Sequence, residues 1–348
     1  MNKPPVPAPR ERAARKGFTL VELLVAMSIL VMLSVMLVGV MSAVNTQWTQ
    51  AQAQIERRQD ARAILDMMAS ELKSALLPAD VSATNSLQFI VNPPPAMISG
   101  TDLNPSAIFW QAPIAHNTSL GDIAEVGYFV KWDATTTPAN PKAELCRFFV
   151  DPAVVQNPAV VQNSIFVSNT NFLIYSKPAS WLTPSLIDGV APANSADNYV
   201  GWFADNVVGL WVRCLDAYGQ PIVLTSGSSA TTSAGVNYAA YGFDSRAGYS
   251  DSQGHVKNGV IKTPSGSIGP GFTQTLCALP ASVDIAIVVL DSKSALRLTS
   301  VITPGTPTTP VTLNSFWSDI NTFLAALPAN ARQGARLYST RVNLLNAK

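Results

Sequence analysis

The chain has 348 residues, with 23 lysines and arginines against 22 aspartates and glutamates. Hydrophobic residues make up 47% of it and charged residues only 13%, about half the charged share of an ordinary soluble domain. This composition excludes a disordered, charge-rich tail protein, and the balanced charge argues against a protein that binds nucleic acid. Three cysteines are too few for a disulfide scaffold.

The start of the chain joins a basic segment to a long apolar run. Residues 1–17 hold five basic residues and one acidic residue, a net side-chain charge of +4. The next 27 residues, Phe18–Val44, hold a single charge, Glu22. A helix of that length spans about 40 Å, enough to cross a bilayer. We therefore expect a single-pass transmembrane helix with residues 1–17 in the cytoplasm, because Lys and Arg are enriched in cytoplasmic flanks.

Glu22 distinguishes this run from simpler targeting segments. A secretory signal has an apolar region of about 7–15 residues that ends in a small-residue cleavage site, and this run is longer and lacks a clear site. A plain signal anchor fits the length but leaves Glu22 unexplained. An ionised carboxylate in hydrocarbon costs at least about 2.5–3.5 kcal/mol, so an acid inside a membrane segment indicates a function.

The junction resembles the type III signal of type IV pilins and type II secretion pseudopilins. The resemblance rests on Lys16-Gly17-Phe18-Thr19-Leu20-Val21-Glu22. In that family a membrane-embedded prepilin peptidase cuts after the glycine and methylates the new N-terminus. The resemblance implies cleavage between Gly17 and Phe18 and N-methylation of Phe18, with Arg15 and Lys16 as the basic residues of the leader.

The same resemblance gives Glu22 a partner. A carboxylate in lipid needs a cation, and the free α-amine of Phe18 on a neighbouring subunit supplies one. We therefore expect Glu22 to form a charge pair in filament assembly; the alternative is a signal anchor with a chance glutamate. The implied partners are the prepilin peptidase, other major and minor pilins or pseudopilins, and an inner-membrane assembly platform.

We expect the helix to continue past the membrane. No Gly or Pro interrupts residues 42–77, so residues 18–77 form one helix about 90 Å long, ended by Pro78. Its transmembrane half is 18–44 and its amphipathic half is 45–78. One face is expected to pack on a globular domain and carries Ile55, Ile64, Leu65, Met68, Leu72 and Leu76. The opposite face is expected to be solvated and carries Glu56, Arg57, Arg58, Asp60, Arg62, Asp66, Glu71 and Lys73.

Residues 79–348 are expected to form a β-rich periplasmic domain. Short runs rich in β-branched and aromatic residues alternate with loops of Pro, Ser, Thr and Gly. The expected strands are Leu87–Val91, Ala107–Gln111, Ile123–Trp132, Leu145–Val150, Ser164–Val167, Phe172–Tyr175, Val207–Leu215, Pro221–Leu224, Val283–Leu290 and Arg336–Asn343. The fold class is α+β and pilin-like, a long N-terminal helix packed on an antiparallel β-rich domain. Four tryptophans are expected in its core: Trp110, Trp132, Trp202 and Trp211.

Further segments resemble the larger minor subunits, the J-type pseudopilins and W-type minor pilins. They are Arg58–Arg62 with Leu65 and Glu71–Lys73, Val207–Asp216 with Gly219, Leu279–Ile285, and Tyr338–Asn346. Length, spacing and the closing strand also resemble Verru_Chthon cassette proteins of the C type. Unlike the J/W pattern, a segment at about 225–275 intervenes, rich in Ser, Gly, Thr, Ala and Tyr. It is either an exposed recognition surface or a solvated excursion with a short hairpin of its own.

The sequence holds no catalytic or cofactor motif. His116 and His255 are far apart, and HExxH, GxSxG and P-loop patterns are absent, so an enzyme is not expected. Asp244 and Asp251 could supply oxygen ligands for Ca²⁺, but their spacing matches no known loop, and no metal or other cofactor is expected. Three cysteines lie in or beside expected strands, where one pair could bridge or all could be buried hydrophobes. They are Cys146, Cys214 and Cys277.

Two functional classes follow. The first is a structural subunit, a minor pseudopilin or minor pilin in the tip or priming complex of a type II secretion pseudopilus or type IV pilus-like filament. The second is a pilus-tip adhesin or substrate-binding module anchored by a pilin-type helix.

Overall fold

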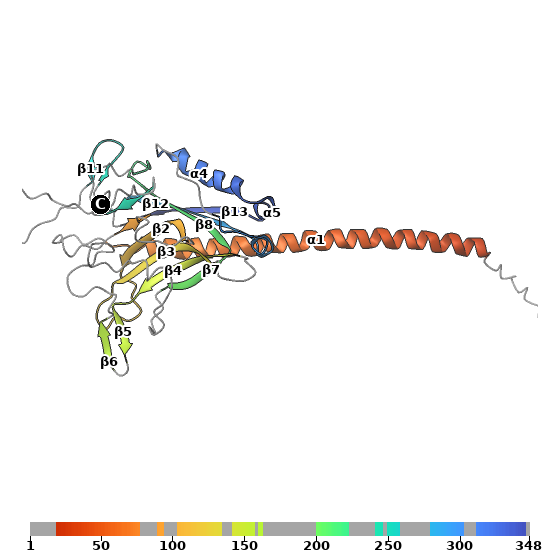
Figure 1. Ribbon diagram of the computed structural model, residues 1–348, viewed down its shortest axis with the longest axis horizontal. Coiled ribbons are helices and arrows are strands. Elements are labelled where there is room, and N and C mark those ends of the chain that lie inside the picture. The colour runs from red at the N-terminus through yellow and green to blue at the C-terminus, as the bar shows by residue number, and fades with distance from the viewer. Residues whose placement is uncertain are drawn as a thin grey trace, which may run out of the picture. The chain divides into compact units, whose positions relative to one another are not determined.

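The computed structural model describes residues 19–76, 89–93, 103–133, 141–156, 159–162, 200–222, 241–245, 249–257, 279–302 and 311–345. The chain divides into two compact units, Met1–Ile55 and Glu56–Lys348. The described part of the first unit is helical and fully exposed apart from Ala53. The described part of the second unit holds antiparallel β-sheets, the last turns of the long helix and three shorter helices (Figure 1). The expected α+β, pilin-like fold class is therefore confirmed.

The long helix α1 runs from Leu20 to Lys73, a length of 54 residues. It ends four residues before Leu77, the expected last residue, so the expected end is wrong. The reason is a tertiary hydrogen bond, in which the Leu76 N–H donates to the carbonyl oxygen of Gln111 at 3.0 Å. The Leu76 N–H is thereby paired with a strand residue instead of a helical carbonyl, and no sequence pattern marks that change.

The second unit, Glu56–Lys348, which we call the globular unit, buries one stripe of α1. Ala61, Ile64, Leu65, Met68 and Leu72 are buried in its main core, at the helical spacing that the sequence predicts. The prediction that Ile55 belongs to the same buried stripe is wrong, because Ile55 is 58% exposed. The stripe starts later than its apolar residues suggest, because burial begins only with Arg57.

The larger sheet has six antiparallel strands in the order β7-β4-β3-β2-β1-β9. Their bounds are β1 Ile90–Val91, β2 Leu103–Ala112, β3 Ala124–Asp133, β4 Lys142–Val150, β7 Val200–Asp205 and β9 Phe243–Asp244. Alternate residues of β3, namely Val126, Tyr128 and Val130, belong to the same core as Met68 of α1. One face of this sheet therefore holds the C-terminal turns of the helix.

The smaller sheet has three antiparallel strands in the order β13-β12-β8, and it separates two cores. The strands are β8 Val207–Leu215, β12 Ser282–Val289 and β13 Arg336–Asn343. Alternation along β12 sends Ile285 and Ile287 into the core shared with α1, and Ala286 and Val288 into a second core. Every residue of β12 is therefore buried.

Helix α4, Leu313–Ala326, covers the second face of this sheet (Figure 1). Phe316, Ile320 and Phe323 recur at helical spacing and lie in one cluster with Trp211. Thr312 caps the helix, since its side chain accepts from the Ser315 N–H while Ser315 Oγ accepts from the Thr312 N–H. This helix was not expected. Two single-turn helices flank the region, α3 Ser292–Ala295 and α5 Ala329–Arg332.

A charge cluster around the buried carboxylate of Asp284 connects the three strands. Asp284 on β12 accepts from Arg213 Nε at 3.0 Å and Nη2 at 2.8 Å on one side, and from Arg341 Nε at 2.7 Å on the other. These residues are directly opposite one another in the register. The Arg213 guanidinium also stacks 4.4 Å from the ring centre of Phe316 on α4. A shift of one residue would move Asp284 to the other face, so the cluster fixes the register.

Two short ribbons complete the described part. Strands β5 Ala153–Gln156 and β6 Ala159–Gln162 pair antiparallel and stand apart from the six-stranded sheet (Figure 1). They repeat one sequence, because residues 152–157 and 158–163 both read PAVVQN. Strands β10 Tyr249–Ser250 and β11 Val256–Lys257 form a second hairpin. It lies within the segment at 225–275, where the sequence allowed a short hairpin.

The remaining strand expectations have mixed outcomes. The bounds of β13 equal those expected, and β8 also matches. The expected strand Pro221–Leu224 is reduced to one bridge between Leu215 and Pro221, and its last two residues lie outside the described part. The expected strands Ser164–Val167 and Phe172–Tyr175 also lie outside it. Trp202, expected in the core, is 76% exposed on strand β7, whereas the other three tryptophans are buried.

Candidate functional site

The candidate site is the first turn of α1, where Thr19 and Glu22 bond reciprocally. The Thr19 N–H and Oγ1 both donate to Glu22 Oε2 at 3.0 Å, and the Glu22 N–H donates to Thr19 Oγ1 at 3.3 Å. This is a capping box, which satisfies two backbone donors that a helix start leaves without partners. The pattern Thr-x-x-Glu before an apolar run is the sequence signal for this motif, in addition to the charge of Glu22.

The other expected site residues precede this turn. Arg15, Lys16, Gly17 and Phe18 lie outside the described residues, and Thr19 is the first residue that the structure describes. The capping box therefore follows directly on the expected cleavage site in the sequence. Their expected roles remain predictions.

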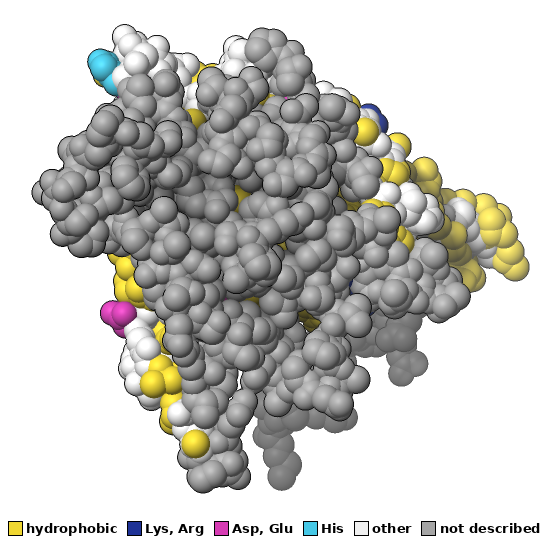
Figure 2. Space-filling view, turned by 60° about the vertical axis from the view of Figure 1, so that its left-hand side comes forward, with side chains coloured by type: hydrophobic (Ala, Val, Ile, Leu, Met, Phe, Trp, Pro, Cys, Tyr) yellow, Lys and Arg dark blue, Asp and Glu magenta, His cyan; other side chains and the backbone are white. Residues whose placement is uncertain are grey.

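The helix after Glu22 is apolar, exposed and uncharged. Within Leu20–Val44 every residue is exposed, and no charged residue occurs from Leu23 to Ile55. Figure 2 shows this part of the chain at the right of the view, with yellow hydrophobic side chains on its surface. Among the described residues, α1 is the one helix long and apolar enough to cross a membrane. Apolar surface of this extent needs lipid or other helices to cover it.

Comparison with known proteins decides the nature of this segment. Residues 12–38 carry a prokaryotic N-terminal methylation motif. This motif is the signal of type IV pilins and pseudopilins, and it implies processing by a prepilin peptidase and assembly with other pilins. It includes three of the five basic residues before Gly17, namely Arg12, Arg15 and Lys16, and most of the apolar run after Phe18. The searches of curated proteins and of solved structures returned no match.

Further along α1, the helix is joined to the six-stranded sheet by a partly buried ion pair. Arg147 on β4 donates from Nη2 to Glu71 Oε1 at 2.6 Å and from Nε to Oε2 at 3.3 Å. The Tyr128 hydroxyl donates to the same Oε2 at 2.6 Å. Burial and the Glu71 carboxylate raise the pKa of Tyr128, so the hydroxyl stays a donor. The solvated position expected for Glu71 is therefore wrong, because Arg147 and Tyr128 of the sheet supply three hydrogen-bond donors to its carboxylate.

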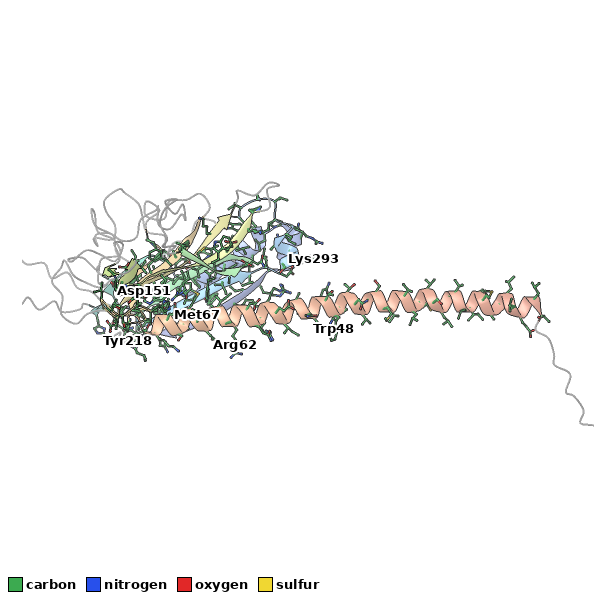
Figure 3. The ribbon with its side chains drawn as sticks, turned by 90° about the horizontal axis from the view of Figure 1, so that it is seen from below. Trp48, Arg62, Met67, Asp151, Tyr218 and Lys293 are labelled. Carbon is green, nitrogen blue, oxygen red and sulfur yellow. The ribbon has the colours of Figure 1, made fainter. Side chains whose placement is uncertain are left out.

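A second polar contact holds the first buried turn of α1. Arg57 donates from Nη1 to the carbonyl oxygen of Gly334 and lies 3.6 Å from Asp291 Oδ2. Its side chain is 9% exposed, so its expected place on a solvated face is also wrong. Arg62 keeps its expected exposed position and pairs with Asp66 across one helical turn (Figure 3).

The described residues hold no arrangement that suggests metal or acid–base chemistry. No three His, Cys, Asp or Glu side chains among them could hold a metal ion. His116 lies 3.6 Å from Asp151, and His255 lies 3.1 Å from Asp251, at two separate loops. Asp251 also accepts from the N–H groups of Gln253 and His255, so it organises a turn. The side chain of Asp244 lies outside the described part.

The described cysteines are buried thiols. Cys146 and Cys214 are both free, so they do not bridge each other. Burial raises the pKa of Cys146 to about 12 and that of Cys214 well above its usual value, which leaves both unreactive near neutral pH. Cys277 lies outside the described residues.

Proposed function

We propose that this chain is a minor pseudopilin or minor pilin, a structural subunit of a type II secretion pseudopilus or a type IV pilus-like filament. One observation carries the proposal. The methylation motif at residues 12–38 runs into an uninterrupted helix whose exposed apolar surface holds a single charge, Glu22. A helix whose apolar surface is exposed among the described residues is suited first to lipid and then to the core of a filament.

In this proposal the chain is made as an inner-membrane precursor, with residues 1–17 as a cytoplasmic leader and residues 18–44 in the bilayer. Residues 45–78 form the amphipathic half of the helix, and residues 79–348 form the periplasmic domain. A prepilin peptidase cuts between Gly17 and Phe18 and methylates Phe18, with Arg15 and Lys16 as the basic residues that it meets. An inner-membrane assembly platform then adds the subunit to a filament.

Glu22 has two successive partners in this scheme. In the single chain its carboxylate is held by Thr19, so it is not an orphan charge. In the filament we propose that it turns to the methylated amine of Phe18 on a neighbouring subunit. The exchange replaces a hydrogen bond by a charge pair, which lipid favours strongly over a lone charge.

A place at the filament tip, in the priming complex, is supported by size. Removal of 17 residues from 348 leaves 331. A bulky domain stacks poorly along a filament but fits at its end. Two structural features add to this bulk, namely the second core under α4 and the segment at 225–275.

The test is mass spectrometry of the N-terminus after co-expression with a prepilin peptidase. We expect a chain that starts at Phe18 and carries one added methyl group. Gly17→Ala should abolish cleavage. Gly39→Ala is the matched control, because a Cβ at Gly39 meets no atom within 4 Å and the residue lies outside the motif's cleavage site. An intact Met1 in the unaltered protein would overturn the proposal and leave a signal-anchored β domain.

The alternative, a tip adhesin or substrate-binding module, depends on the segment at 225–275. Part of that segment is structural, because β9 pairs with β1 and Phe243 packs edge-on against Phe89 with ring centres 5.9 Å apart. The Tyr241 hydroxyl donates to Asp319 on α4 at 2.6 Å. Deleting the whole segment would therefore remove core residues as well as any ligand surface.

The two functions are separated by a finer deletion. Residues 225–240 and 258–275 are each replaced by a short Gly-Ser linker, and residues 241–257 are kept. If the variant assembles but loses binding of a secreted substrate or host surface, the segment is a receptor. If it assembles and the filament works normally, the adhesin alternative fails.

A further inference from the structure

We propose that Trp48 anchors α1 in the lipid headgroup layer at the C-terminal end of its apolar run, and that this anchor places Glu22 in the opposite headgroup layer before assembly. The inference rests on the proposed membrane span of α1. It adds a lipid-binding residue and a depth for Glu22, neither of which the methylation motif specifies.

The first observation is the position of Trp48. The apolar run ends at Val44, and Trp48 follows one turn later, after the uncharged polar residues Asn45, Thr46 and Gln47. Trp48 is 69% exposed, and Figure 3 shows its side chain pointing away from the helix. An exposed indole just outside an apolar helix is typical of the membrane interface, where the ring meets the acyl boundary and the N–H meets headgroups and water.

The second observation is the distribution of charge. After Glu22 the next charged residue is Glu56, so 33 successive residues of one helix carry no charge. Such a stretch is about 50 Å long, compared with about 40–45 Å for a bilayer including its headgroup layers. The stretch therefore covers a whole bilayer, and its polar uncharged end, residues 45–55, begins in the headgroup layer and continues beyond it.

The third observation is the spacing between Glu22 and Trp48. They are 26 residues apart on a continuous helix, which corresponds to about 39 Å along its axis. The hydrocarbon core is about 30 Å thick, so with Trp48 at one interface Glu22 lies at or beyond the other hydrocarbon boundary for a near-upright helix. The carboxylate and its Thr19 partners then stay hydrated until assembly draws them into a filament core.

The test uses fluorine NMR of the full chain in lipid nanodiscs. All tryptophans are replaced biosynthetically by 5-fluorotryptophan, and the Trp48 and Trp202 signals are assigned by Trp48→Phe and Trp202→Phe. Trp202 is the matched control, because it is 76% exposed but lies on strand β7. A Leu33→Trp variant adds a probe to the middle of the apolar run. Spin labels are then placed either on lipid headgroups or at acyl-chain ends.

We expect headgroup labels to remove most of the Trp48 signal and chain-end labels to remove less, with the reverse order for the Leu33→Trp probe and little effect on Trp202. If the Leu33→Trp probe responds to chain-end labels while Trp48 responds no more than Trp202, the helix spans the bilayer and the anchor inference is overturned. If Trp48 is shielded from lipid labels only in discs that hold two copies, it contacts a neighbouring subunit and the inference also fails. A Leu33→Trp probe that no lipid label affects would instead contradict the membrane span itself.

Discussion

Arg57 of α1 donates a hydrogen bond to the carbonyl oxygen of Gly334, 277 positions further along the chain. Asp291 balances its charge from 3.6 Å, and the Arg57 residue as a whole is 8% exposed. Arg57 is the first residue of α1 that the structure buries. The buried part of α1 therefore begins with a charged contact at Arg57. The buried apolar residues of the helix come after it in the sequence.

Gly334 should tolerate no side chain. A Cβ at this position would overlap Ser294 Oγ and Asp291 Oδ2, and Asp291 is the ion-pair partner of Arg57. We expect Gly334→Ala to lower the free energy of unfolding by about 1–3 kcal/mol, the usual cost of overpacking. Urea unfolding of the purified protein measures it, with Gly201→Ala as the control because its Cβ would make only an ordinary contact at 3.9 Å. Equal stability of the two variants would contradict the packing at Gly334.

The two carboxylates Glu71 and Asp66 of α1 should differ sharply in their contribution. The partly buried Glu71 carboxylate accepts hydrogen bonds from Arg147 and Tyr128, and removing its charge leaves the arginine without a counter-charge. We expect Glu71→Gln to cost about 3 kcal/mol. Asp66→Asn breaks a pair whose side chains are 83% and 74% exposed, so it should change stability by less than about 1 kcal/mol. Similar losses in denaturant melts would argue against the Glu71 contact.

Glu125 on β3 should make the protein less stable as the pH rises. Its carboxyl oxygens are buried and have no hydrogen-bond partner among the described residues, and burial raises its pKa well above 4.5. The folded state keeps the proton that the unfolded chain releases, so above its ordinary pKa this residue lowers the free energy of unfolding by about 1.4 kcal/mol per pH unit. The decrease ends at the raised pKa of the folded state.

Glu125→Gln removes that dependence. We expect the variant to match the unaltered protein near pH 4, where both side chains are neutral, and to be more stable at pH 8. Thermal unfolding across this range compares the two. A difference in stability that stays constant between pH 4 and pH 8 would show that Glu125 ionises in the folded protein.

The capping and charge-pairing roles of Glu22 can be separated by substitution. Glu22→Gln keeps an acceptor for the Thr19 N–H but removes the charge, whereas Glu22→Val removes both. We expect peptidase processing of both variants, because Gly17 and Phe18 are unchanged, and a loss of co-assembly with partner pilins in both. The amount of subunit in sheared filaments is the measurement. Normal assembly of Glu22→Gln with failure of Glu22→Val would assign Glu22 to helix capping and not to a charge pair.

The local sequence pattern predicted those helices and strands that form through contacts between residues close in the sequence. The helical spacing of Ile64, Leu65, Met68 and Leu72 identified the face of α1 that is buried, and the β-rich run ending at Asn343 gave the last strand. The capping box was also readable, since Thr19 and Glu22 are three positions apart. It was missed because the charge of Glu22 suggested an intermolecular partner first.

Contacts between distant segments could not be predicted in this way. The sequence pattern places Arg57 and Glu71 on a solvated face of the helix. Their partners, Gly334 for Arg57 and Arg147 for Glu71, come from distant parts of the chain and are seen only in the structure. Helix α4 has its own signals in Thr312 and the spacing of Phe316, Ile320 and Phe323, but they follow a Thr- and Pro-rich stretch that reads as a loop. Trp202 shows the converse error, because composition favours burial of an indole that the edge strand exposes.

The charge cluster on β12 has a consequence for the order of events during synthesis. Asp284 meets Arg213, which was made 71 residues earlier, but its second arginine, Arg341, is made only 57 residues later. Throughout that interval one edge of β12, a mostly apolar strand that the folded protein buries completely, has no neighbour, and an unpaired edge of this kind recruits other chains. Translation that pauses or stops between residues 290 and 335 should therefore yield aggregates in place of a partly folded domain, and a chaperone bound to β12 would be most useful within that interval.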